Sequence, residues 1–146
     1  MGRFLLALLF VATTAFSQTS HLNTKKGVVA KGYDVVAYFG NEAIKGKKKF
    51  STAYENATYR FSSEENLNIF KSNPAKYMPQ YGGYCAYAVG VNGEKVDINP
   101  KTFEIRDGKL YLFYNSWRTN TLKAWLKEDP NKLRKKADEN WSKIVN

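Results

Sequence analysis

Cys85 is the single cysteine of this 146-residue chain, and it lies in a stretch rich in tyrosine and glycine. Its thiol has four open roles: a buried inert group, a reactive thiolate, a metal ligand, or a partner in a bond to another molecule. An internal disulfide is excluded because there is no second cysteine. A reactive thiolate would need a lowered cysteine pKa, and no histidine stands beside Cys85 in the sequence.

As a metal ligand, Cys85 would need partners, and the candidates are Met78, Tyr81, Asp34 and Asp97. A thiolate together with a thioether favours Cu(I) over zinc or magnesium. Two soft ligands make a poor site without a third, and a structural zinc site needs about four Cys or His ligands. The sequence therefore leaves a copper site open and argues against a zinc module.

The only histidine, His21, lies in residues 18–30, a polar segment that we interpret as a flexible leader. Near a mature amino terminus its imidazole and the free amine could together bind Cu(II); the alternative is an unstructured histidine in a tail. With His21 in a leader, no Ser-His-Asp or Cys-His pair forms in the core. Since no phosphate loop or dinucleotide fingerprint is present either, hydrolase, kinase and Rossmann-type functions are disfavoured.

Tyrosines surround Cys85, and tyrosine combines apolar area with a hydroxyl group that suits ligand sites. We therefore expect a non-catalytic binding module whose aromatic pocket, formed by Tyr33, Tyr81, Tyr84 and Cys85, holds a small ligand or a metal ion. Asp34 could join this pocket as a ligand or base, or it could cap a turn. Two other functions stay open: a thiol-dependent enzyme or redox protein that uses Cys85, and a structural or interaction protein with no pocket.

The first seventeen residues have the order of a signal peptide: a charged Arg3, an apolar run over 4–12, and a small-x-small cleavage site at 15–17. The apolar run is shorter than the roughly 20 residues that span a bilayer. We expect this segment to be removed, residues 18–30 to form the leader, and residues 31–146 to form one domain. This predicts an exported protein, periplasmic or secreted, with no transmembrane segment.

The chain is basic, with a formal net charge of +10, and its lysines cluster before the Cys85 region and again near the carboxy terminus. Such a surface can bind nucleic acid, anionic lipid or acidic glycans. No nucleic-acid-binding motif is present, and an exported protein rarely meets nucleic acid, so that partner is disfavoured. The alternative is that the lysines are solvated and support solubility.

An α+β fold is expected from the elements that must position these residues. Turn signals and alternating patterns predict a small antiparallel sheet with hairpins at Asn92-Gly93 and Asp107-Gly108. The expected strands cover residues 33–39, 59–61, 84–91, 94–98, 102–106 and 109–114.

Capping residues and prolines predict helices on either side of that sheet. Short central helices are expected within 64–79, the first of them capped by Ser62. A carboxy-terminal helix pair is expected to begin near Ser116 and to restart at Asp129-Pro130, where aspartate caps and proline fits the first turn. The sequence shows no internal repeat that we could identify.

Several spaced motifs resemble the YHS domain family: YRFSSEEN at 59–66, FKSNPAKY at 70–77 and YGGYCA at 81–86. GYDVVAYF at 32–39 and the tryptophan near the carboxy terminus resemble the exported, stand-alone bacterial members, so the resemblance spans nearly the whole mature chain. It implies an α+β fold.

The same resemblance implies a link to copper, because YHS domains attached to copper-transporting ATPases are suspected to bind metal through a cysteine pair. This chain departs from that pattern. Ser62 and Asn66 lie near the positions where the cysteines would be expected, and only Cys85 remains. The candidate metal ligands are therefore Cys85, Met78 and His21, with copper as the implied ion.

Overall fold

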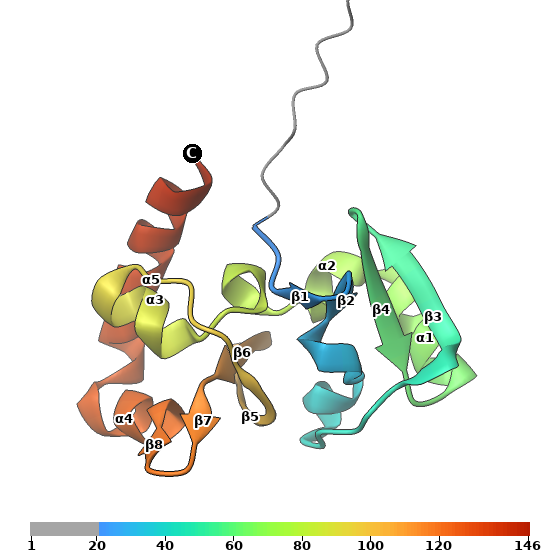
Figure 1. Cartoon of the computed structure of the whole chain (residues 1–146), viewed down its shortest axis with the longest axis horizontal. Helices are drawn as coiled ribbons and strands as arrows, with labels where there is room; N and C mark the ends of the chain where they lie inside the picture. The colour runs from blue at the N-terminus through green and yellow to red at the C-terminus, as the bar shows by residue number, and fades with distance from the viewer. Residues whose placement is uncertain (1–20) are drawn as a thin grey trace, which may run out of the picture.

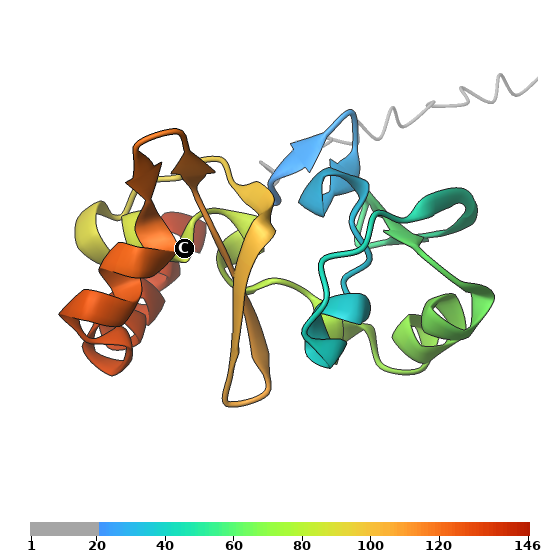
Figure 2. The same ribbon diagram turned by 90° about the horizontal axis from the view of Figure 1, so that it is seen from below.

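The computed structural model describes residues 21–146, which form two parts of similar construction that stand side by side (Figure 1). The expected signal peptide lies outside the described residues. In Figures 1 and 2 the amino-terminal part lies on the right and the carboxy-terminal part on the left. We call them the first half (21–77) and the second half (79–146). No helix in the described part of the chain is long and apolar enough to cross a membrane.

The first half is built on a four-stranded sheet with the strand order β1-β2-β4-β3. Its strands are β1 (Thr24–Lys25), β2 (Val28–Val29), β3 (Lys47–Tyr54) and β4 (Ala57–Phe61). The pairing of β2 with β4 is parallel, and the other two pairings are antiparallel. Two 3-10 turns, η1 (Ala30–Gly32) and η2 (Ala37–Gly40), connect β2 to β3.

Two helices complete the first half, α1 (Glu64–Ser72) and α2 (Pro74–Tyr77). α1 buries Phe70 against the hairpin, with ring centroids 4.7 Å from Tyr59 and 5.0 Å from Phe61. Such aromatic contacts stabilise beyond the area that they bury. They hold α1 on the β3–β4 hairpin.

The second half begins with η3 (Gln80–Gly83) and the helix α3 (Ala86–Asn92). The strands β5 (Asn99–Arg106) and β6 (Lys109–Phe113) then form an antiparallel hairpin, and β7 (Asn115–Ser116) and β8 (Thr119–Asn120) form a smaller one. The chain ends with α4 (Thr121–Glu128) and α5 (Pro130–Val145). α3 packs closely on α5: a Cβ added at Gly90 would stand 2.9 Å from the Leu133 carbonyl oxygen.

The two halves repeat one structural plan, which the sequence analysis did not find. Each hairpin has the same pairing, with the same register irregularity, when the numbering is shifted by 52. The pairs Lys47–Phe61, Ser51–Arg60 and Thr52–Tyr59 correspond to Asn99–Phe113, Phe103–Leu112 and Glu104–Tyr111. In each half a helix and then a second helix that begins with proline come after the hairpin, directly in the first half and after β7–β8 in the second.

The repeat extends to the entry of each half. Three successive residues with positive φ, 30–32 in one half and 81–83 in the other, precede a Tyr-Asp pair and a Tyr-Cys pair respectively. The Asp34 N–H then bonds to the Ile44 carbonyl at 2.8 Å, and the Cys85 N–H bonds to the Val96 carbonyl at 2.9 Å. Asp34 and Cys85 therefore occupy equivalent positions.

The expected strand over 84–91 is wrong, because α3 begins at Ala86 and covers most of these residues. Ala86, Val89 and Gly90 are buried at helical spacing, and this face packs on α5. Gly93, with φ 67, ends the helix, and its N–H bonds to the Val89 carbonyl at 3.0 Å. Asn92-Gly93 is therefore a helix terminus and not a hairpin turn, and 94–98 is not a strand.

The expected strand over 33–39 is also wrong. Asp34 bends the chain there, because its carboxylate accepts hydrogen bonds from the backbone N–H groups of Val36 and Ala37. Two boundaries differ as well. Ser63, not Ser62, caps α1 by accepting from the Asn66 N–H, and the first carboxy-terminal helix begins at Thr121 after the β7–β8 hairpin.

The α+β class is confirmed, with antiparallel hairpins and a carboxy-terminal helix pair. The hairpin at Asp107-Gly108, the central helices and the helix start at Asp129-Pro130 lie where the sequence predicted them. Part of the expected leader, however, is folded. β1 and β2 belong to the sheet, and Val29 is buried in the core, so ordered structure begins before residue 31.

The core consists of two apolar clusters. The first contains Val29, Val35 and Tyr38 from the first half together with Leu110 and Leu112 from the second. The second cluster belongs to the second half alone and centres on Trp125, which is buried against α3 and α5 residues and β6.

A close backbone approach fixes the loop before β3. A Cβ added at Gly46 would stand 2.5 Å from the Arg60 backbone carbonyl carbon, whereas Gly40 has open space around it. We predict that Gly46→Ala lowers the free energy of unfolding by about 1–3 kcal/mol, because β4 must shift. Gly40→Ala is the matched control and should stay within about 0.5 kcal/mol. Urea unfolding checks both; equal effects would contradict the close approach.

Candidate functional site

The Asp34 carboxylate is fully buried and accepts five hydrogen bonds from the described residues. One oxygen accepts from the Val36 and Ala37 N–H groups, at 2.9 and 3.1 Å. The other accepts from the Ser62 N–H, the Ser62 hydroxyl and the Asn66 side-chain amide, at 2.8, 2.7 and 2.8 Å. Asp34 therefore caps a turn and joins it to the start of α1.

This arrangement bears on the implied copper site. Ser62 and Asn66, near the positions where the family resemblance places a cysteine pair, both donate to Asp34 and are thereby occupied. Hydroxyl and amide groups are also not the soft ligands that copper(I) prefers. Among the described residues no three His, Cys, Asp or Glu side chains are grouped so that they could hold a metal ion. Ser62 and Asn66, at the positions where the resemblance implies cysteines, therefore do not fit copper.

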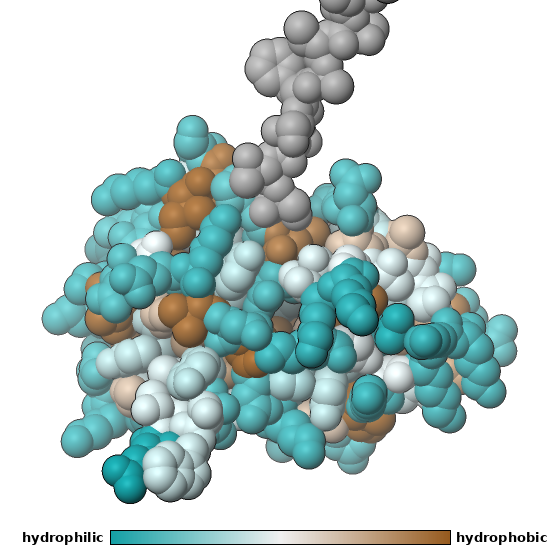
Figure 3. Space-filling model, in the orientation of Figure 1, coloured by the Kyte–Doolittle hydropathy of each residue, from teal (hydrophilic) through white to brown (hydrophobic). Residues whose placement is uncertain are grey.

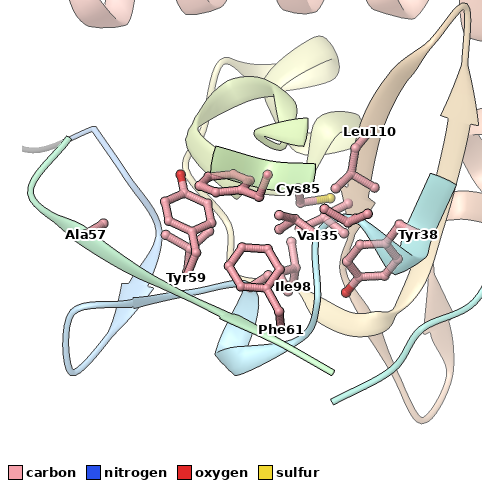
Figure 4. Close-up of a cluster of buried hydrophobic side chains, with 13 residues drawn as sticks. Val35, Tyr38, Ala57, Tyr59, Phe61, Cys85, Ile98 and Leu110 are labelled. Atoms are coloured by element: carbon pink, nitrogen blue, oxygen red, sulfur yellow. The ribbon is translucent and has the colours of Figure 1, made fainter. Parts of the chain in front are cut away.

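Cys85 is completely buried among apolar side chains (Figure 4). Figure 4 shows its sulfur between Val35 and Leu110, inside the first core cluster. Its sulfur makes one polar contact within residues 21–146, with the Thr121 hydroxyl oxygen 3.3 Å away. Since that hydroxyl donates to the Tyr114 carbonyl at 2.7 Å, the Cys85 S–H is the donor of the pair. The structure therefore presents Cys85 as a protonated thiol in the core.

The described residues form an open groove of about 620 Å³ between η3 and the end of α5. We call it the aromatic groove. Its lining includes His21, Glu55, Met78, Tyr81, Asp138 and Trp141. It brings together three of the predicted site residues, His21, Met78 and Tyr81, from segments far apart in the sequence.

Trp141 is the centre of the rings at the groove. Its centroid lies 6.2 Å from those of His21 and Tyr81 and 6.3 Å from that of Tyr84. The Lys95 ammonium stands over the faces of Trp141 and Tyr84, 6.0 and 5.6 Å from their centroids, which is within the range of a cation–π contact.

Tyr81 donates its hydroxyl hydrogen to the Asp138 carboxylate at 2.8 Å. Burial, and after it this hydrogen bond, raises the pKa of Tyr81 well above its usual value. The phenol therefore stays protonated at physiological pH and holds the carboxylate in place. Because Asp138 itself is exposed, its carboxylate remains accessible at the groove.

His21 is a poor metal ligand in this setting. Its Nδ1 lies 2.9 Å from the Lys95 Nζ, and an ammonium group can only donate. Nδ1 is therefore the acceptor of this contact. A metal ion at the His21 ring would stand close to the Lys95 charge, which opposes binding.

The remaining predicted site residues lie apart from the groove lining. Tyr33 packs against the first core cluster, and Asp34 is buried in the first half. Tyr84 is half-buried and reaches the groove only through Trp141. Asp97 joins the two halves, accepting from Asn23 at 3.0 Å and pairing with Lys31 at 2.9 Å. The expected pocket of Tyr33, Tyr81, Tyr84 and Cys85 therefore does not form.

Sequence analysis missed Glu55, Asp138 and Trp141 as groove residues. Trp141 is half-buried and lines the groove from α5. The spacing of Asp138 and Trp141, three residues apart, places a carboxylate and an indole on the same face of a helix, and this was an available signal. Glu55 gave no signal, because only the fold brings the β3–β4 turn to α5.

The buried Asp34 carboxylate suggests a conservative test. Asp34→Asn keeps the size but turns an NH₂ group toward donors that need an acceptor. We predict a loss of about 2–3 kcal/mol in the free energy of unfolding, since buried donors are left unsatisfied. Asp129→Asn, at the exposed cap of α5, is the control, because asparagine caps a helix equally well. Similar losses in chemical denaturation would mean that the Asp34 network is unimportant.

The burial of Cys85 predicts slow chemical modification. Labelling of the native thiol with a disulfide reagent should be at least about 100-fold slower than that of an exposed cysteine, because the sulfur becomes accessible only when the structure opens. A Cys85→Ser/Ser116→Cys double variant supplies that exposed reference, since Ser116 lies on the surface of β7. Rates followed by absorbance decide the matter, and comparable rates would show that Cys85 is accessible.

Comparison with known proteins gives one match. Residues 40–81 match the family model of the YHS domain. The matched segment contains β3, β4, α1 and α2 and ends at Tyr81, so it covers the hairpin and helices of the first half. No curated protein and no solved structure matches the chain. The sequence comparison thus identifies a YHS domain at residues 40–81, and the structure shows the same plan a second time in the residues that follow.

Proposed function

We propose that this chain is an exported, stand-alone YHS-type protein that acts as a non-catalytic binding module, and that the aromatic groove is its ligand site. The observation that carries the proposal is the character of the groove. It combines an accessible indole with two carboxylates, Glu55 and Asp138. These are the acidic side chains of the lining, and His21 is its basic side chain.

The charge of the groove is opposite to that of the molecule. The chain as a whole has a formal net charge of +10, yet the ions that line this groove are carboxylates. Lys95 lies beyond the lining and is turned to His21 and the rings. A carboxylate next to an aromatic face suits a cationic group, through an ion pair and a cation–π contact.

These features favour one class of ligand, a small organic amine with an apolar body. The apolar part would lie against Trp141 and Met78, and the ammonium group would bind Asp138. The volume of about 620 Å³ falls within the range of pockets that hold small molecules. Burial of Cys85 in the core disfavours the thiol-dependent enzyme, and the groove itself disfavours a protein without a pocket.

Export is part of the proposal. Its support is the charged, apolar and small-residue order of residues 1–17, which is typical of a signal peptide. Removal of that segment would place the protein in the periplasm or outside the cell. The amine ligand would then come from that compartment.

A metal ion is the second candidate, because His21 and Met78 both line the groove. Imidazole and thioether groups are copper ligands. The Lys95 ammonium, 2.9 Å from the His21 Nδ1, opposes the binding of a metal cation there. Copper therefore enters the test as a separate arm.

The test compares three probes that share a phenyl ring and differ in charge: phenethylamine, 2-phenylethanol and phenylacetate. Ligand-observed NMR should rank their affinities in that order. Asp138→Asn should weaken phenethylamine about three- to fivefold, as loss of a partly exposed ion pair does. It should leave 2-phenylethanol unchanged. Trp141→Leu should weaken all three probes.

Matched controls are Asp129→Asn and Trp117→Leu, because Asp129 caps α5 outside the groove and Trp117 is 90% exposed on the β7–β8 turn. Equal binding of the amine and the acid, or equal effects of Trp141→Leu and Trp117→Leu, would overturn the proposal. Copper binding that is lost in both His21→Gln and Met78→Leu, without amine binding, would favour the metal ion instead.

A further inference from the structure

A small basic pocket lies in the first half, where β1 and β2 meet β4. Its volume is about 220 Å³, and its lining consists of Lys25, Lys26, Lys31, Arg60 and Val28. Four of these five side chains are cations. Figure 3 shows hydrophilic side chains gathered over β1, β2 and β3, on the face that Figure 1 presents. We call this pocket the basic pocket.

Three of its cations have no partner among the described residues. Among residues 21–146 the structure records an ion pair for Lys31, with Asp97, and none for Lys25, Lys26 or Arg60. Nor does the side chain of any of these three form a hydrogen bond in the described part of the chain. Asp97 is already bound by Lys31 and Asn23, so it does not neutralise them. No carboxylate among the described residues therefore pairs with Lys25, Lys26 or Arg60.

The backbone holds these cations in place. Lys26 and Gly27, with φ 51 and 76, form the tight turn between β1 and β2. Arg60 extends from β4 over Gly32, where a Cβ would stand 3.7 Å from its Cδ and 3.8 Å from its Nη1. The Thr58 N–H bonds to the Gly27 carbonyl at 2.8 Å and ties the turn to the same strand. The cluster is therefore arranged by the sheet and not only by flexible side chains.

From this geometry we propose that the basic pocket is a binding site for a phosphate-type oxyanion. The half-buried Arg60 guanidinium supplies the fork that matches two oxygens of a phosphate group. Lys25 and Lys26 supply additional charge at the rim, and Val28 forms an apolar floor. The anion supplies the negative charge that the three unpaired cations lack among the described residues. This site lies on the β1–β2 turn and is separate from the aromatic groove, so it does not depend on the function proposed for that groove.

Free phosphate and a lipid phosphate headgroup share this chemistry, and two probes distinguish them. Inorganic phosphate should raise the melting temperature of the protein in a saturable manner, because it binds the folded state. Sodium chloride of equal ionic strength is the reference. Phosphatidylcholine vesicles that contain phosphatidic acid test the headgroup by co-sedimentation. Binding to either probe, dependent on Arg60, supports the site.

The variants are Arg60→Gln, Arg60→Lys and Lys26→Asn. Lys132→Gln is the control, because it also removes one positive charge and Lys132 is exposed on α5, outside the pocket. Asparagine tolerates the left-handed backbone at position 26. Arg60→Gln should weaken phosphate binding at least about tenfold, and Arg60→Lys should weaken it less, because the charge remains but the fork is lost. Lys26→Asn does not touch the core, so it tests the pocket even if the Arg60 variants are unstable.

Lys132→Gln should bind phosphate as the unmodified protein does. The proposal is overturned if Lys132→Gln and Lys26→Asn weaken binding equally, since the effect would then be one of net charge alone. It is also overturned if neither inorganic phosphate nor the acidic vesicles bind. Binding of the vesicles without binding of inorganic phosphate, abolished in Lys26→Asn, would assign the site to a lipid headgroup.

Discussion

The Asp34 carboxylate is the constraint on which the first half depends. It is buried without a cation, and it is stable there because five N–H and O–H groups converge on its two oxygens. A buried charge without such partners would cost several kcal/mol. Its hydrogen bonds bend the chain after Tyr33, fix the residues that follow β4 and orient Asn66 at the start of α1. The same bonds engage Ser62 and Asn66, which lie near the positions where the family resemblance implies a cysteine pair.

The equivalent position in the second half is stabilised by different contacts. Cys85 replaces the aspartate, and a single contact with Thr121 replaces the five hydrogen bonds. Apolar neighbours surround the thiol, which costs little to bury. The second half is therefore held by Trp125 and the packing of α3 on α5, whereas the first adds a polar network to its apolar core. One structural plan is thus stabilised at equivalent positions by two kinds of interaction.

Local chemistry predicted much of the fold, and its failures have a common physical cause. Asp107-Gly108 and Asp129-Pro130 were correctly assigned because the turn and the cap depend on neighbouring residues alone. Asn92-Gly93 carries the same kind of signal, but contact with α5 makes the preceding residues helical. Asp34 likewise overrides the β-propensity of Val35 and Val36. At the site, Tyr81 and Met78 were predicted, whereas the partners Glu55 and Trp141 come from elements that only tertiary structure brings together.

The mixed core has a consequence for how the molecule unfolds. A chain that contains one plan twice could behave as two independent units, each melting by itself. Here Leu110, Leu112 and Cys85 of the second half fill the first apolar cluster, and the Tyr38 hydroxyl reaches across to the Pro100 carbonyl at 2.5 Å. Neither half can then lose its structure without exposing apolar surface of the other. The two halves share one structural plan but do not unfold independently. Residues 21–146 therefore unfold as one cooperative unit.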